Sequence, residues 1–228
     1  MIGRVTDPSE RVTPPAGSVR HVLFDADGVL QELPGGWHSA MEPFLGERTQ
    51  EFLEQTWADE LPTLRGDGDY LPMLETLLLS YDERLDVDEV YDAVWRNITV
   101  HEASLQLVKS VRAAGLGVHL GTNQEQHRAR HMRTALGYDE LFDVSCYSHD
   151  LGVAKPDPAF FVAAAERIGD DPAAILFIDD SSRNVEGARR AGMRAVHWDI
   201  TQGYDRLSEL MVAEGVDVRT ADVEGRIS

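Results

Sequence analysis

The stretch that decides the fold is His21-Val22-Leu23-Phe24-Asp25-Ala26-Asp27-Gly28. Its first four residues form a short, mostly apolar run, and two acidic residues and a glycine follow closely. A buried strand of a parallel sheet has this character where it ends and passes the chain to a loop. We therefore expect a strand at residues 21–24, and a following loop that carries Asp25 and Asp27 at an edge of the sheet.

Four later apolar runs end in polar or glycine-containing segments in the same way, so the sequence predicts five strands in all. The later runs cover residues 116–120, 141–146, 175–178 and 195–198. Helical periodicity followed by a glycine is found over residues 104–114, 125–136, 158–168, 183–191 and 205–214. Strands that alternate with helices of this length pair in parallel through right-handed crossovers. The predicted fold class is therefore α/β, a doubly wound, Rossmann-like parallel sheet with helices on both faces.

Residues 31–102 interrupt this alternation between the first strand and its expected helix. Helical periodicity dominates the interruption, with almost no strand signal. The expected helices cover residues 41–57, 70–80 and 87–98, with Trp37, Trp57 and Trp95 as large apolar anchors. The predicted domains are a flexible N-terminal arm at 1–18, a Rossmann-like catalytic core at 19–30 and 103–228, and a small helical cap at 31–102. Because the cap leaves and rejoins the core near the strand ends, it is placed to act as a lid.

The charge and cysteine content of the chain bear on its partners and its compartment. There are 21 Lys and Arg residues against 40 Asp and Glu residues, for a net charge of −19, and such a surface repels nucleic acid. No apolar run reaches the roughly 18 residues of a membrane span. Cys146 is the only cysteine, which predicts a buried core thiol in a cytoplasmic protein without disulfides. We expect no nucleic-acid or membrane partner, and no feature of the sequence specifies an oligomeric state.

Charged and polar side chains stand at the ends of the predicted strands, where ligands bind in an open parallel sheet. They are Asp25 and Asp27 after the first strand, Thr122 and Asn123 after the second, Lys155 after the third, and Asp179 and Asp180 after the fourth. Clustered carboxylates raise one another's pKa unless a cation neutralises them, and their oxygens suit Mg²⁺. One carboxylate can attack phosphorus while another acts as general acid, and a lysine and a hydroxyl can hold the phosphoryl group.

With these motifs in this order, the chain resembles the haloacid dehalogenase-like hydrolases, most of which are Mg²⁺-dependent phosphatases. The resemblance spans roughly residues 19 to 210. It rests on Phe24-Asp25-Ala26-Asp27-Gly28-Val29-Leu30, on Thr122-Asn123, on Lys155-Pro156-Asp157 and on Phe177-Ile178-Asp179-Asp180-Ser181-Ser182-Arg183-Asn184. The last motif is similar to that of the phosphatase domain preceding mammalian epoxide hydrolase and of some bacterial sugar-phosphate phosphatases.

The resemblance implies a role for each of these residues. Asp25 would be the nucleophile, Asp27 the acid/base, and Lys155 a catalytic residue. The phosphate ligands would be Thr122, Asn123 and Lys155, and the Mg²⁺ ligands would be Asp25, the backbone carbonyl of Asp27, Asp180 and also Asp179. The predicted function is that of a Mg²⁺-dependent phosphatase, which hydrolyses a small soluble phosphate monoester, such as a sugar phosphate, through an aspartyl-phosphate on Asp25.

Other functions remain open at this point. A phosphomutase would share the same core and return the phosphoryl group to a sugar. A dehalogenase is disfavoured, because dehalogenase relatives lack an aspartate at the position of Asp27. A receiver-like switch has its paired acids first in the chain, whereas here Asp25 comes first. A non-catalytic binding module would have less reason to keep the complete set.

Three histidines are weaker candidates. His127 and His131 have the spacing of a zinc pair, but Arg128, Arg130 and Arg133 beside them would repel a cation. Helix faces rich in Glu and Arg, in general, are interpreted as solvated surfaces. His38 follows the first motif, near where related mutases place a cap histidine, and we expect it to be solvated or to cap a helix.

Overall fold

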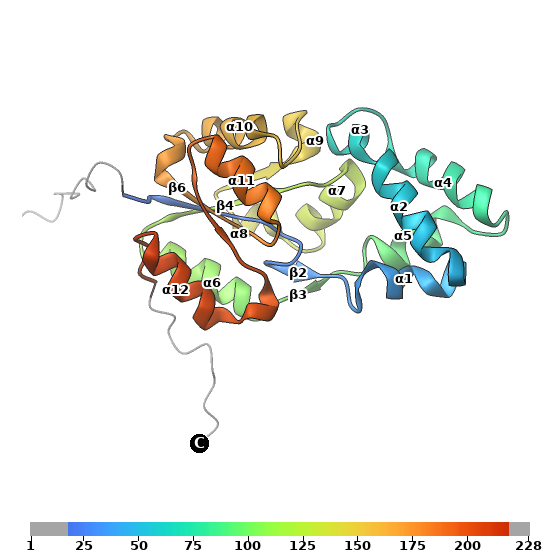
Figure 1. Ribbon diagram of the computed structural model, residues 1–228, viewed down its shortest axis with the longest axis horizontal. Coiled ribbons are helices and arrows are strands. Elements are labelled where there is room, and N and C mark those ends of the chain that lie inside the picture. Colours follow the sequence, from blue (N-terminus) through green and yellow to red (C-terminus); the bar gives the residue numbers. More distant parts are fainter. Residues whose placement is uncertain (1–17, 219–228) are drawn as a thin grey trace, which may run out of the picture.

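The computed structural model describes residues 18–218, which form two parts that lie end to end along the long axis of the molecule (Figure 1). One part is a parallel sheet with helices on both faces, and the other is a group of helices from one continuous segment of the chain. Apart from Ser18, the N-terminal arm predicted at 1–18 lies outside the described residues.

Five parallel strands form the main sheet, in the order β5-β4-β1-β6-β7. They are β1 (His21–Phe24), β4 (Gly117–Thr122), β5 (Val144–Tyr147), β6 (Ile175–Asp179) and β7 (Arg194–His197). Phe24, the last residue of β1, lies opposite Leu120 of β4 and Ile178 of β6. The loop after the central strand therefore lies between the ends of its two neighbours, and the prediction of a doubly wound parallel sheet is confirmed.

Helices cover both faces of this sheet. One face is covered by α6 (Glu102–Ala113), α7 (Gln126–Thr134) and α12 (Tyr204–Ala213), and the other by α10 (Pro158–Ile168) and α11 (Ser182–Arg190). Successive side chains of a strand point to opposite faces. Val22 and Phe24 accordingly belong to the hydrophobic cluster of the first face, and Leu23 belongs to that of the second.

Several predicted elements have different limits in the structure. The strand predicted at 141–146 begins only at Val144, because Tyr138–Leu141 forms the short helix α8. The helix predicted over 41–57 is two helices, α1 (Gly36–Leu45) and α2 (Thr49–Asp59), separated by the 3-10 turn η1 (Gly46–Arg48). Gly46 has a φ angle of 54°, and this left-handed conformation breaks the helical path.

Residues 36–95 form a unit that we call the helical insert, and it has a hydrophobic cluster of its own. Besides α1 and α2, the insert contains α3 (Leu61–Leu64), α4 (Tyr70–Tyr81) and α5 (Val87–Val94). Trp95 belongs to the cluster and Trp37 packs against it. The prediction that Trp57 is an apolar anchor is wrong: its side chain is 45% exposed, because α2 turns Phe52 and Leu53 inward instead.

A short antiparallel ribbon of β2 (Gln31–Glu32) and β3 (Thr99–Val100) connects the insert to the sheet. Strands of two residues are too short to leave a periodic signal in the sequence. The ribbon keeps the outgoing and returning chains side by side, so both connections lie close to the loop that follows β1. The remaining short elements are α9 (Ser148–Leu151), η2 (Pro172–Ala174) and η3 (Ile200–Gln202).

Two further expectations concern membranes and the single thiol. Within residues 18–218, no helix combines the length and the apolar character needed to cross a membrane. Cys146 is fully buried in the cluster beneath α10 and α11, which confirms that it is a core residue. Burial raises the pKa of its thiol to about 11.

A buried histidine on β4 makes stability depend on pH. His119 is 3% exposed, and its Nε2 atom lies 2.9 Å from Nδ1 of His21. Burial lowers the pKa of His119 to about 4, and His21 and Arg112 add to this effect, whereas Asp143 opposes it. Between pH 6.5 and 4 the unfolded chain therefore binds a proton at this residue that the folded chain does not, so falling pH favours unfolding.

We expect His119→Gln to lose less stability on acidification than the wild type does. Between pH 7 and pH 5 the difference in unfolding free energy should be about 2 kcal/mol, from the size of the pKa shift. Urea unfolding of both proteins at the two pH values measures it. Groups that do not contact His119 are common to both proteins and cancel, and substitution of His38, an exposed histidine of α1, by Gln is the control. Equal slopes for His119→Gln and wild type would contradict the prediction.

Candidate active site

The polar side chains predicted to lie together converge at the carboxyl end of the sheet. Asp25 directly follows β1, and its backbone N–H donates to the carbonyl oxygen of Ile178 at 2.9 Å. Asp179 ends β6 and Thr122 ends β4, the two strands that flank β1. All three side chains are buried. The parallel register thus brings together residues that are far apart in the sequence.

Lys155 joins two of the carboxylates. Its Nζ atom lies 2.6 Å from Oδ1 of Asp25 and 2.7 Å from Oδ2 of Asp179, and the residue is 5% exposed. Burial alone would lower the pKa of Lys155, but the charges of Asp179 and Asp25 outweigh it and raise that pKa above the ordinary value. The lysine therefore stays protonated and supplies a fixed positive charge.

The side chain of Asn123, which is predicted to bind phosphate, is hydrogen-bonded to the main chain of Lys155. Its side-chain amide donates to the backbone carbonyl of Lys155 at 2.9 Å, and its Oδ1 accepts from the backbone N–H of Lys155 at 2.8 Å. Both ends of the amide are thus engaged with one residue. Asn123 holds the main chain from which the Lys155 side chain extends.

Three carboxylates, from Asp25, Asp179 and Asp180, come close enough to share one cation. Each offers an oxygen atom, and these atoms lie within 4.8 Å of one another. Burial raises the pKa of Asp25 well above its ordinary value, with Lys155 opposing and Asp179 adding to the effect. Burial and the charge of Asp179 likewise raise the pKa of Asp180 to about 6. One lysine cannot balance three ionised carboxylates, and their crowded oxygen atoms suit a hard cation such as Mg²⁺.

The surroundings fix these carboxylates in place. Asp179 accepts hydrogen bonds from the backbone N–H of Ser181 at 2.8 Å and from the side-chain amide of Asn184 at 3.0 and 3.1 Å. Gly28 has a φ angle of 76°, and a Cβ atom there would overlap the Asp180 carboxylate. The glycine in the first motif is therefore required both by the backbone conformation and by the close approach of Asp180.

Asp27 is held by a buried arginine that the sequence analysis missed. Nη1 and Nη2 of Arg128 donate to the two carboxylate oxygens of Asp27 at 2.7 and 2.8 Å. Side-chain amides of Gln31 and Gln124 also donate to Asp27, at 3.0 and 2.8 Å. Burial favours the neutral acid, but Arg128 and the amides prevail and lower the pKa of Asp27 to about 2.

The interpretation of helix faces rich in Glu and Arg as solvated surfaces is wrong for Arg128, which is 4% exposed. One signal in the sequence could have found it: Arg128 lies in the first turn of the helix that follows the Thr122-Asn123 strand end, so it must be near the same edge of the sheet. Thr122 is connected to this group, because the amide of Gln124 also donates to its hydroxyl at 3.0 Å.

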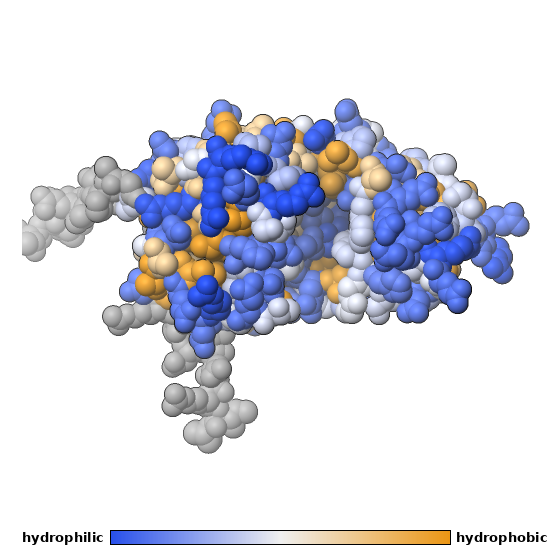
Figure 2. All heavy atoms as spheres, in the orientation of Figure 1, coloured by the Kyte–Doolittle hydropathy of each residue, from blue (hydrophilic) through white to orange (hydrophobic). Residues whose placement is uncertain are grey.

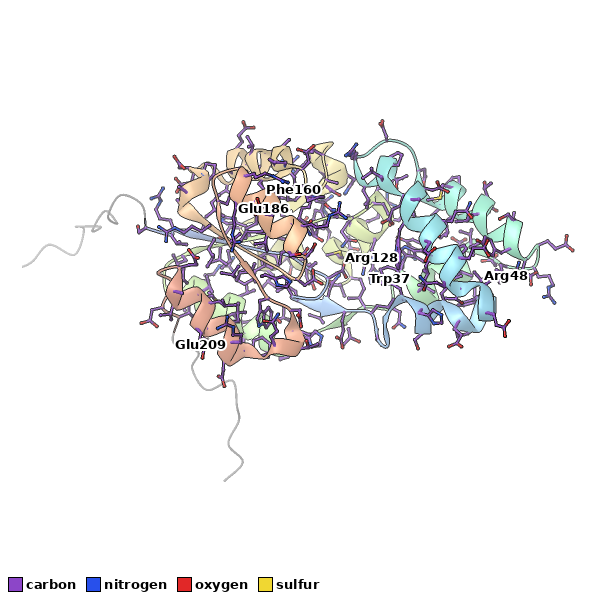
Figure 3. The ribbon with its side chains drawn as sticks, viewed as in Figure 1. Trp37, Arg48, Arg128, Phe160, Glu186 and Glu209 are labelled. Atoms are coloured by element: carbon purple, nitrogen blue, oxygen red, sulfur yellow. The ribbon has the colours of Figure 1, made fainter. Side chains whose placement is uncertain are left out.

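The first turn of α7 also holds the helical insert. The Nε atom of Arg128 donates to the backbone carbonyl of Trp95 at 2.8 Å, and its guanidinium lies 5.5 Å from the centre of the Trp37 ring (Figure 3). Nε2 of His127 lies 2.7 Å from the Asp69 carboxylate. His127 thus contacts the insert, while His38 is exposed on α1.

A cavity of about 220 Å³ lies between the insert and the core, next to Asp27. Its walls are formed by Asp27, Trp37, Trp57, Glu60, Leu64, Trp95, Asn123, Gln124, Glu125 and Arg128. A wider cleft of about 910 Å³ shares Trp57, Glu60, Leu64 and Asn123 with it and extends to Lys155, with Arg65, Arg183 and Arg190 also on its walls. Figure 2 shows the surface hollowed between the two parts of the molecule. Asp27 thus contributes to the walls of the smaller cavity and Lys155 to those of the wider cleft.

Comparison with known proteins places this arrangement in a family. The haloacid dehalogenase-like hydrolase family model matches residues 19–192. A protein named Phosphatase MT3486 from Mycobacterium tuberculosis is 31% identical over 189 residues, which cover 78% of this chain and 86% of that protein. A phosphoglycolate phosphatase from Escherichia coli O157:H7 is 25% identical over 230 residues, covering 90% and 88% of the two chains.

Solved structures show the same fold. An enzyme of the haloacid dehalogenase-like (HAD) family from Bacteroides thetaiotaomicron, in complex with magnesium and inorganic phosphate, superimposes with a TM-score of 0.70 at 21% sequence identity. The match covers 83% of this chain and 99% of that one.

Proposed function

Because the chain belongs to the haloacid dehalogenase-like hydrolase family, we propose that it is a Mg²⁺-dependent phosphatase that cleaves small phosphate monoesters through an aspartyl-phosphate on Asp25. The chain is an enzyme of the phosphatase type. The observation that carries the finer proposal is the buried array of Asp25, Lys155 and Asp179 with Asp180 beside it.

Asp25 is suited to be the nucleophile. In the first step a carboxylate oxygen of Asp25 bonds to phosphorus, and the bond between phosphorus and the alcohol oxygen breaks. In the second step water attacks the same phosphorus, inorganic phosphate leaves, and the carboxylate is restored. Lys155 supports both steps, because its ammonium lies 2.6 Å from Asp25 and its positive charge opposes the effect of burial on the pKa of that carboxylate.

The carboxylates of Asp25 and Asp180 would hold Mg²⁺, together with the backbone carbonyl of Asp27. The carboxylate of Asp179 would complete the group of acidic side chains around the cation. When bound, the cation would neutralise charge on the transferring phosphoryl oxygens. Lys155 and the Thr122 hydroxyl would bind those oxygens as well, and Asn123 would act on them through Lys155.

Asp27 would transfer protons. The alcohol oxygen needs a proton when it leaves, and the attacking water must lose one. Because Arg128 keeps Asp27 ionised, the carboxylate is arranged to take the proton from water. To protonate the alcohol it must first bind a proton, which requires that its two hydrogen bonds to Arg128 loosen.

We propose that residues 31–102, which include the helical insert, serve as the cap, and that the substrate is a small soluble ester such as a sugar phosphate. The cavity of about 220 Å³ and the net charge of −19 both disfavour macromolecular polyanions. A cytoplasmic location remains a proposal that rests on the single, buried thiol. The mutase alternative gains no support, since His38 is exposed and does not line the cavity.

We expect phosphate release from small monoesters to stop when a chelator removes divalent cations, and to return with excess Mg²⁺. The reason is that the carboxylates of Asp25, Asp179 and Asp180 crowd one site, where a divalent cation would offset their mutual repulsion and neutralise charge on the phosphoryl oxygens. A colorimetric phosphate assay measures this result, and circular dichroism in chelator controls for unfolding. Full turnover in metal-free buffer would contradict the proposal, and an isomerised ester without released phosphate would favour a mutase.

A further inference from the structure

The cavity beside Asp27 has a chemical character that bears on which alcohol the substrate carries. Its volume of about 220 Å³ suits a small alcohol. Its walls include three tryptophans, Trp37, Trp57 and Trp95, together with residues that carry carboxylate or amide side chains. A molecule with both C–H faces and polar groups matches such walls.

The single guanidinium of this cavity is not free to bind an anion. Arg128 donates four hydrogen bonds, of which two go to Asp27, one to the Gln124 side chain at 2.8 Å, and one to the backbone carbonyl of Trp95. A carboxylate in the substrate could bind Arg128 well only by displacing Asp27. The charge of Arg128 is thus already compensated.

The glutamate carboxylates on the cavity walls differ in whether they have hydrogen-bond partners. Glu125 caps α7: it accepts from the backbone N–H groups of His127 and Arg128, both at 2.6 Å, and from the Tyr91 hydroxyl. Glu60 is half-buried, and within residues 18–218 its carboxylate makes no hydrogen bond or ion pair. Burial raises the pKa of Glu60 to about 7, as expected for a carboxyl group that lacks a partner.

From this contrast we infer that Glu60 determines specificity by accepting hydrogen bonds from hydroxyl groups of the leaving alcohol. The enzyme therefore prefers phosphate esters of polyhydroxy alcohols, such as sugars, over esters whose alcohol carries a carboxylate. A carboxylate in this cavity would face Asp27, Glu60 and Glu125 with no available cation. This inference rests on the proposed phosphatase function and adds the class of alcohol to it.

The test compares three esters with the full-length protein in Mg²⁺: glucose phosphate, phosphoglycolate and nitrophenyl phosphate. Glu60→Leu removes the acceptor and Glu60→Lys reverses its charge. Glu54→Leu and Glu54→Lys are the matched controls, because Glu54 is an exposed residue of α2 outside both cavities. Thermal unfolding of each variant controls for folding.

We expect the wild-type protein to have a kcat/KM for glucose phosphate at least about tenfold above that for phosphoglycolate. Glu60→Leu should lower the glucose phosphate value by roughly 10- to 100-fold, mainly through KM, because a hydrogen bond to a charged group is lost. Nitrophenyl phosphate offers no hydroxyl donor, so its hydrolysis should change less than about twofold. Glu60→Lys should raise the phosphoglycolate value, and the Glu54 variants should behave as wild type.

Two results would overturn the inference about Glu60 and leave the proposed phosphatase function intact. One is a wild-type preference for phosphoglycolate, which would indicate that arginines of the wider cleft receive the alcohol. The other is an equal loss on all three esters in Glu60→Leu. Failure to hydrolyse any ester, nitrophenyl phosphate included, would overturn the proposed function itself, and the inference with it.

Discussion

Replacing Asp25 with asparagine should lower kcat on every phosphate ester by roughly 10⁴-fold or more, the scale seen when an enzyme loses its nucleophile. Asparagine has nearly the same shape, but its amide cannot form the acyl phosphate. Phosphate release measures the rate, and intact-protein mass spectrometry after acid quenching should find a phosphorylated form in the wild type and none in the variant.

The matched comparison for this variant is Asp27→Asn. It should lower kcat by roughly 10²–10⁴-fold on alkyl esters, since proton transfer is lost. The loss should be smaller on nitrophenyl phosphate, whose alcohol leaves without a proton. Near-wild-type turnover by a correctly folded Asp25→Asn protein would show that Asp25 is not the nucleophile.

Substitution of Lys155 by methionine should lower kcat/KM by roughly 10²–10³-fold, because a fixed charge beside the transferring oxygens is removed. Methionine has a similar length and no charge. The change also leaves Asp25 and Asp179, which are 6% and 0% exposed, without their shared cation. Steady-state kinetics should therefore show the lower kcat/KM, and thermal unfolding should show a lower unfolding temperature.

The stability loss of Lys155→Met should be larger in chelator than in excess Mg²⁺, because a bound cation can neutralise part of the same carboxylate cluster. Lys109→Met is the control, since Lys109 is an exposed residue of α6. A Lys155→Met protein with unchanged kinetics and unfolding temperature would show that this lysine contributes to neither catalysis nor stability, and would remove the basis for the phosphate site.

The strand ends were predictable from the sequence because their signals are local. An apolar run that stops at Asp25, at Thr122 or at Asp179 marks the end of a buried strand without knowledge of its neighbours. Parallel pairing then requires that such ends meet at one edge. The same reasoning failed for β2 and β3, whose two residues each are too few for a pattern, and for the break at Gly46 between α1 and α2.

The sequence by itself determined the sheet, the helical insertion and the line of reactive residues, because each depends on periodicity and on order along the chain. Only the tertiary structure decided what those residues contact. The hydrogen-bonded ion pair of Asp27 and Arg128 joins positions 101 apart in the sequence, and the hydrogen bond from Asn123 to Lys155 joins positions 32 apart. Glu60 faces the cavity because of how the insert packs on the core. No local pattern encodes such partners, because hydrogen bonds and burial depend on which surfaces the folded chain brings together.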